Sequence, residues 1–194
     1  MNTVHEFSKA LKPGSVYRRE YLGEVASGDT DYLLKKLCKE GVLKKVQHGL
    51  YYRPALTDFG EKFPKEHLLL KSFLKSDRFL CVSPNDYNSL GLGTTQLYNM
   101  TYVYNAKRNG FFEFLGRKYR FFKKFDFPSK VTREFLVVDL LNNLKLLAED
   151  GEKVKKALAE RISDFDAKTL RLMADRYGKV GTKKLLKGLL SVSA

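Results

Sequence analysis

The hydrophobic and polar positions of the first 55 residues switch between a helical period and a strand-like period. Apolar residues recur at helical spacing from Val4 to Leu11, and Pro13-Gly14 ends that run. Further along, short β-prone segments flank Gly49, which tolerates the positive φ of a tight turn. The pattern predicts, in order, a helix at 4–11, a brief strand at 15–17, a helix at 18–25, a turn at 26–28, a helix that ends at Gly41, and strands at 42–46 and 50–52.

The third predicted helix has an apolar side and a basic side. Ser27 or Asp29 can cap its first turn. Its apolar residues are Leu33, Leu34 and Leu37, and its polar face carries Tyr32, Lys35, Lys36 and Lys39. A basic helix followed at once by a two-stranded ribbon is typical of the recognition helix and wing of a winged helix-turn-helix. The alternative is a small helix-plus-hairpin unit with a solvated, lysine-rich face.

A winged helix-turn-helix places the second helix of its pair in the major groove, with the N-terminal half near the base edges. Asp31 would be unfavourable there unless it caps the helix or accepts a hydrogen bond from a cytosine amine. We therefore expect the DNA-binding residues to be Arg18 and Arg19 as a clamp, Thr30 and Tyr32 near bases, Lys35, Lys36 and Lys39 near phosphates, and Lys44, Lys45 and His48 in the wing.

The rest of the chain predicts an α+β domain. A turn-rich connector at 54–65 separates a DNA-binding domain at 1–55 from a second domain at 56–194. The second domain begins with a buried helix at 66–74, a strand at 79–82 and a short helix at 86–90. Strands at 96–104, 111–115 and 118–123 then predict an antiparallel meander, and helices at 132–150, 152–162, 167–177 and 182–190 are expected to pack on it.

Basic and aromatic residues alternate along the predicted meander. Such interleaving suits single-stranded nucleic acid, whose bases stack on Tyr102, Tyr104, Tyr119 or Phe121. The simpler interpretation is that the rings form the core face of a one-sided sheet while lysines protect its edges.

The formal net charge of +14 favours a polyanionic partner. Residues 1–55 contain ten Lys/Arg and six Asp/Glu, a net +4, which leaves +10 for the remainder. No segment has the length and apolarity of a membrane span, and the N-terminus lacks the apolar run of a signal peptide, so we expect a cytoplasmic protein without a membrane partner.

No catalytic, metal or cofactor site stands out in the sequence. His5, His48 and His67 are far apart and lack metal-ligand spacing, and the cysteines form no cluster. Gly91-Leu92-Gly93 lacks the strand and lysine context of a phosphate loop. We therefore expect neither an enzyme nor a cofactor.

Three stretches together resemble the AbiEi-type antitoxins of type IV toxin–antitoxin and abortive-infection systems. The first, LLKKLCKEGVLKKVQHGLYYRP at 33–54, is similar to the family's entry into the wing. The second runs from NSLGLGTTQLYNMTYVYNA to FLGRKYRFFK, and the third is FDAKTLRLMADRYGKVGTKKLLKGLL. They cover most of the chain, and the specificity lies in their order, because many winged helices share the first.

The resemblance implies a winged helix that binds inverted repeats in the promoter of its own operon, and a second domain that supplies antitoxicity. The cognate toxin would be a nucleotidyltransferase-like protein, countered without the need for a stable complex. This chain has Lys44 and Lys45 where the family often has arginine, which weakens the case for bidentate guanine contacts. The residues we expect to supply antitoxicity are the basic positions Lys107, Arg108, Arg117, Lys118 and Arg120.

Two other functions fit the same sequence. One is a winged-helix transcription regulator whose second domain senses a ligand or dimerises. The other is an RNA-binding accessory protein that uses the basic sheet.

Overall fold

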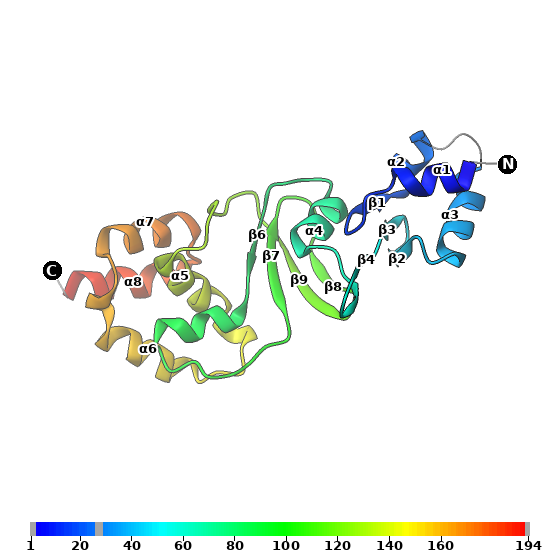
Figure 1. The fold of residues 1–194 in the computed structure, drawn as a ribbon. Helices are drawn as coiled ribbons and strands as arrows, with labels where there is room; N and C mark the ends of the chain where they lie inside the picture. The colour runs from blue at the N-terminus through cyan, green and yellow to red at the C-terminus, as the bar shows by residue number, and fades with distance from the viewer. Residues whose placement is uncertain (1–2, 26–28, 193–194) are drawn as a thin grey trace. The chain divides into compact units, whose positions relative to one another are not determined.

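The structure, a computed structural model, describes residues 3–25 and 29–192, and its fold is α+β (Figure 1). The chain divides into two compact units. Unit 1 contains the chain up to Asp77 together with Phe114–Gly116, and unit 2 contains Arg78–Glu113 and the chain from Arg117 onward. The division into domains at 1–55 and 56–194 stays a prediction.

Three helices and a three-stranded sheet form the N-terminal part of unit 1. In chain order these elements are α1 (Thr3–Ala10), β1 (Val16–Arg18), α2 (Arg19–Val25), α3 (Thr30–Lys39), β2 (Lys44–Gln47) and β3 (Leu50–Tyr52). The helices and strands predicted here are therefore confirmed. β3 lies between β1 and β2 and is antiparallel to both. The buried residues among the helices are Phe7, Leu11, Leu22, Leu33, Leu34, Leu37 and Leu43.

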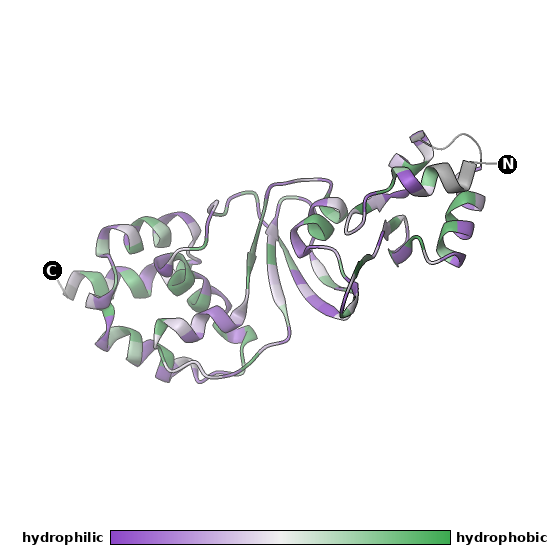
Figure 2. Cartoon of the chain, in the orientation of Figure 1, coloured by the Kyte–Doolittle hydropathy of each residue, from purple (hydrophilic) through white to green (hydrophobic). Residues whose placement is uncertain are grey.

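The start and end of α3 follow from local chemistry. Asp29 is its N-cap, and its carboxylate accepts hydrogen bonds from the backbone amides of Asp31 (2.9 Å) and Tyr32 (3.2 Å). This confirms one of the two predicted caps; Ser27 and the predicted turn at 26–28 lie outside the described residues. Gly41 has a φ of 73° just beyond the helix, in the left-handed region. Coloured by hydropathy, α3 carries hydrophobic and hydrophilic residues on different sides (Figure 2).

The turn-rich connector predicted at 54–65 contains a β-hairpin that the sequence analysis does not predict. β4 (Ala55–Thr57) pairs antiparallel with β5 (Gly60–Lys62). Most residues of the two strands are exposed, so no alternation of hydrophobic and polar positions marks them. The helix predicted next is confirmed as α4 (Glu66–Leu74).

The four-stranded sheet is mixed, so the prediction of an antiparallel meander was wrong. Its strands are β6 (Phe79–Val82), β7 (Thr101–Asn105), β8 (Gly110–Phe114) and β9 (Arg117–Lys123), in the spatial order β6-β7-β9-β8. β7 is antiparallel to β6 and parallel to β9. Residues 96–100, predicted to extend β7, are not in a strand.

Two turns connect β7, β8 and β9. The side chain of Asn105 accepts hydrogen bonds from the backbone amides of Lys107 (2.9 Å) and Arg108 (2.6 Å), which turns the chain at the end of β7. Leu115 and Gly116 both have positive φ, 53° and 76°, as a two-residue hairpin turn requires, and they join β8 to β9. β9 pairs with β7, and β8 lies at the edge of the sheet. Alternation identifies strands, but it does not fix which strands become neighbours.

Helices of unit 2 pack on this sheet, as the sequence predicts. They are the 3₁₀ helix η1 (Pro84–Leu90), α5 (Arg133–Asn143), η2 (Leu144–Leu146), α6 (Gly151–Glu160), η3 (Ile162–Asp164), α7 (Ala167–Tyr177) and α8 (Val180–Val192). One buried cluster joins the core faces of β6 and β7 to α5, α6, α7 and α8. The helix predicted at 132–150 is capped by Thr132 but ends at Asn143.

Candidate functional site

The outer face of α3 carries exposed aromatic and basic side chains. Tyr32 lies three and four residues before the adjacent Lys35 and Lys36, and Lys39 lies four and three residues after them, so all four share one face opposite the buried Leu33, Leu34 and Leu37. None of the three lysines makes an ion pair with a described residue. This face therefore presents three ammonium groups and one phenol to solvent.

An ion pair connects α2 to the first turn of α3. Arg19 donates from Nε to Oδ1 of Asp31 and from a terminal nitrogen to Oδ2, both at 2.9 Å. This hydrogen bonding lowers the pKa of the Asp31 carboxyl below its ordinary value and raises the pKa of Arg19. The pair explains how an acidic residue is accommodated among lysines at this end of the helix, and it occupies the guanidinium that the sequence assigns to a phosphate clamp.

Two further predicted contact residues face other parts of unit 1. Arg18 donates to the backbone carbonyl of Ser72 in α4 (2.7 Å) and to Glu20 (3.3 Å). Thr30 is half-buried, and its hydroxyl lies 3.2 Å from where a Cβ on Gly23 would stand, so it faces α2. The guanidinium of Arg18 is thus bonded within unit 1, and Thr30 faces α2.

The β2–β3 ribbon adds a second set of basic groups beside α3. Lys45 and His48 are exposed, whereas Lys44 forms an ion pair with Glu61 of β5. Gly49 has a φ of 71° in the turn between the strands. A groove lined in part by Asp31, Lys35, Lys45 and Tyr51 separates the ribbon from α3. Lys45 and Lys35 therefore line one continuous surface.

The basic residues proposed for antitoxicity do not form one site. Lys107 and Arg108 follow β7, whereas Arg117 and Lys118 begin β9. The amide of Lys123, at the far end of β9, reaches Asn109 (3.4 Å), so the two basic loops lie at opposite ends of this strand, about 20 Å apart. Arg120 lies between them, 4.7 Å from the ring centre of Phe111 and 5.2 Å from that of Phe122.

The aromatic residues considered for base stacking belong to the core. Tyr102, Tyr104, Tyr119 and Phe121 are each at most 3% exposed. A buried ring has no free face for a base, so the simpler interpretation of the alternation holds.

Within the helix that the sequence predicts at 132–150, α5 contains a buried carboxylate, that of Asp139, which the sequence does not single out. Asp139 is 1% exposed and accepts hydrogen bonds from the hydroxyls of Tyr87 (2.7 Å) and Tyr104 (2.5 Å) and from the amide of Asn143 (3.1 Å). Burial raises the pKa of Asp139, and these donors and Lys124 oppose the increase. The signal in the sequence was an acidic residue in the middle of an apolar run, which requires buried partners.

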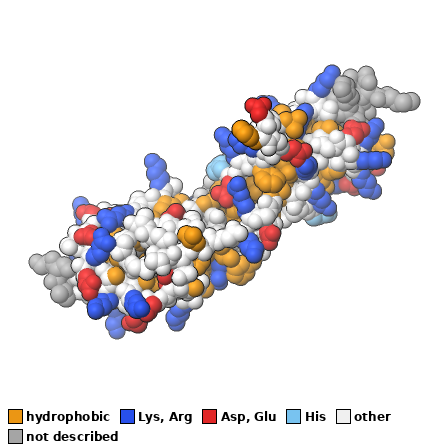
Figure 3. All heavy atoms as spheres, turned by 60° about the horizontal axis from the view of Figure 1, so that its bottom comes forward, with side chains coloured by type: hydrophobic (Ala, Val, Ile, Leu, Met, Phe, Trp, Pro, Cys, Tyr) orange, Lys and Arg blue, Asp and Glu red, His pale blue; other side chains and the backbone are white. Residues whose placement is uncertain are grey.

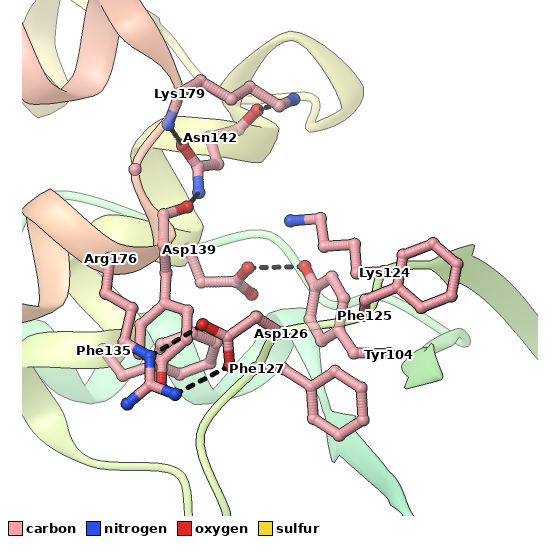
Figure 4. Close-up of a pocket in the computed structure, with 12 residues that line it drawn as sticks. Tyr104, Lys124, Phe125, Asp126, Phe127, Phe135, Asp139, Asn142, Arg176 and Lys179 are labelled. Carbon is pink, nitrogen blue, oxygen red and sulfur yellow. Dashed lines mark hydrogen bonds and ion pairs between the residues drawn. The ribbon is translucent and has the colours of Figure 1, made fainter. Parts of the chain in front are cut away.

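A pocket of about 300 Å³ opens beside this network (Figure 4). Lys124, which directly follows β9, extends its ammonium group toward the side where Asp139 and the Tyr104 hydroxyl lie. Burial lowers the pKa of the half-buried Lys124, repulsion from Lys179 adds to the decrease, and Asp139 partly offsets it. The pocket thus combines aromatic walls with a half-buried cation.

Comparisons of this sequence with known proteins assign it to no family. No protein-family model matches the sequence, and none of the curated proteins matches it.

Among the described residues, no group of three or more His, Cys, Asp or Glu side chains is placed to hold a metal ion. None of the helices within 3–25 and 29–192 has the length and apolarity needed to cross a membrane.

Proposed function

We propose that the N-terminal part of unit 1 is a winged helix that binds double-stranded DNA. α3 is the recognition helix, and the β2–β3 ribbon is the wing. The observation that carries the proposal is the exposed row of Tyr32, Lys35, Lys36 and Lys39 on one face of α3, with Lys45 and His48 beside it. Lys and Arg side chains also occur over much of the visible surface, interspersed with acidic ones, so the argument rests on this face rather than on net charge (Figure 3).

The element order supports this assignment. Helix, strand, helix, helix and two antiparallel strands follow one another, with the strand after α1 pairing with β3. In a winged helix the recognition helix lies in the major groove and contacts base edges near its N-terminus. Tyr32 then approaches bases, and Lys35, Lys36 and Lys39 approach phosphates, whose displaced counterions supply most of the affinity.

Direct binding to DNA from upstream of its own gene tests the proposal. Fluorescence anisotropy with the full chain should show tighter binding to that duplex than to a duplex of the same length and composition in scrambled order. A single-stranded version serves as the third probe. Stronger binding to the single strand than to either duplex would contradict the proposal and favour a protein that binds RNA or single-stranded DNA.

We further propose, on the three stretches that resemble AbiEi-type antitoxins, that the chain acts in the cytoplasm as an antitoxin that represses its own operon. The experiment is co-expression with the product of the adjacent gene, with host growth as the readout. Growth arrest by the neighbour and rescue by this chain supports the proposal. If the neighbour is harmless, or if the chain does not restore growth, a DNA-binding regulator without antitoxin activity remains.

A further inference from the structure

The pocket beside Asp139 is lined by five charged side chains, and four of them have close partners. Arg176 and Asp126 form a bidentate pair with distances of 2.7 and 3.0 Å. Lys179 donates from Nζ to the carbonyl of Asn142 (2.5 Å). Asp139 accepts the three hydrogen bonds already described, two of them from tyrosine hydroxyls. The remaining charge belongs to Lys124.

The ammonium of Lys124 has no hydrogen-bond acceptor among the described residues. Its Nζ lies 4.7 Å from the centre of the Tyr104 ring, so its protein contact is a cation–π contact, which leaves its three N–H groups open to an acceptor from outside the chain. Asp139 attracts it from beyond hydrogen-bonding distance. Because a half-buried ammonium loses hydration, an acceptor that enters the pocket gains a strong, charge-assisted hydrogen bond.

The charges around the pocket leave an excess of one positive charge. Lys124, Arg176 and Lys179 supply three positive groups, and Asp126 and Asp139 supply two negative ones. The remaining walls are largely aromatic and include Phe125, Phe127, Phe135 and Tyr177. Flat apolar walls and one unpaired cation suit a ligand with a planar apolar body and a single negative group.

We propose that this pocket binds a small aromatic carboxylate, with its carboxylate paired to Lys124 and its ring against the aromatic walls. The observation behind the proposal is that the ammonium of Lys124 lies beside a cavity of about 300 Å³ with aromatic walls, which suits the size and the apolar ring of such a ligand. The site lies wholly within unit 2, and the proposal is independent of DNA binding by unit 1.

Benzoate is the probe for a titration of the full chain followed by amide chemical shifts in NMR. We expect shifts at Phe125, Phe127 and Gly178, with a dissociation constant on the order of 1 mM, which is ordinary for so small a ligand. Benzamide keeps the ring without the charge, and acetate keeps the charge without the ring. Both should bind at least about tenfold more weakly than benzoate.

The variant Lys124→Met keeps the length of the side chain and removes its charge. It should weaken benzoate binding about tenfold or more. Lys156→Met is the control, because Lys156 is exposed on α6 and does not line the pocket. Lys156→Met should leave benzoate binding unchanged.

A second reading uses the unaltered chain, so it does not depend on the variant folding. The chain is labelled with ¹³C-lysine, and the Cε shift of Lys124 is followed against pH. Benzoate should raise the pKa of Lys124, because the carboxylate stabilises the ammonium. The proposal is overturned if benzoate does not shift the pocket amides, if benzamide binds as well as benzoate, or if the pKa of Lys124 stays the same.

Discussion

Arg19 and Asp31 connect the start of α2 to the first turn of α3 through two parallel hydrogen bonds of 2.9 Å. The pair neutralises the one acidic side chain within α3 and uses a guanidinium that would otherwise be available to a phosphate. It therefore links the two helices and reduces the negative charge on the outer face of α3.

Replacing Asp31 should strengthen DNA binding if its role is to pair with Arg19. Asp31→Asn removes a negative charge from the interface and releases Arg19 toward the backbone, so affinity at low salt should rise on the order of fivefold. Anisotropy titrations at several salt concentrations measure this. Glu24→Gln is the control, because Glu24 is exposed on α2 and makes no ion pair with the described residues. Weaker binding by Asp31→Asn would instead indicate that Asp31 accepts a hydrogen bond from a cytosine amine.

The same pair predicts an acid-dependent contribution to folding. Arg19 lowers the pKa of Asp31 below its ordinary 3.8, so the folded state binds that proton less readily than the unfolded state. The contribution is present above pH 3.8 and is lost as the pH falls through the lowered pKa. In an NMR titration, the Asp31 carboxyl should titrate at lower pH in the natural chain than in Arg19→Gln. Equal titration midpoints would show that the pair does not persist in solution.

The buried acceptor in α5 should be costly to remove. Asp139→Leu leaves the hydroxyls of Tyr87 and Tyr104 without their acceptor, so it should lower the free energy of unfolding by about 3–5 kcal/mol. Urea denaturation measures the change. Asp175→Asn, at an exposed position of α7, should change it by less than about 0.5 kcal/mol. Comparable values for the two variants would contradict the hydrogen-bond network.

Two glycines with open space around them should respond to alanine in opposite directions. Gly116 has a φ of 76°, so Gly116→Ala should destabilise the protein by about 1 kcal/mol through backbone strain. Gly188 lies within α8, where alanine is favoured, so Gly188→Ala should stabilise it by about 0.5–1 kcal/mol. Thermal unfolding of both variants is the measurement. A stabilising Gly116→Ala would show that the turn between β8 and β9 is not the one described.

Elements with local signals were predictable from the sequence, and arrangements that depend on distant residues were not. The cap at Asp29 and the apolar spacing of Leu33, Leu34 and Leu37 place α3, and Asp166 and Gly178 bound α7 where the sequence expects it. The strand order of the mixed sheet depends on which strands meet after the turns, and no local pattern records that.

In the candidate site, too, some features could be predicted from local sequence and others depend on distant residues. The row of lysines on α3 can be read from helical spacing, whereas the partners of Arg18, Arg19 and Lys44 lie 54, 12 and 17 residues away in the chain. The pocket around Lys124 likewise depends on α5 and α7, which no spacing in the sequence connects to β9.

The most direct measurement of DNA recognition by α3 is the salt dependence of binding for the triple variant Lys35→Ala, Lys36→Ala, Lys39→Ala. Removing three phosphate contacts should weaken binding and reduce the slope of log K against log salt by about three. The control changes three exposed lysines of unit 2, Lys130, Lys156 and Lys184, and should leave both the affinity and the slope unchanged. If the α3 variant binds as tightly as the natural chain and with the same slope, α3 is not the recognition helix.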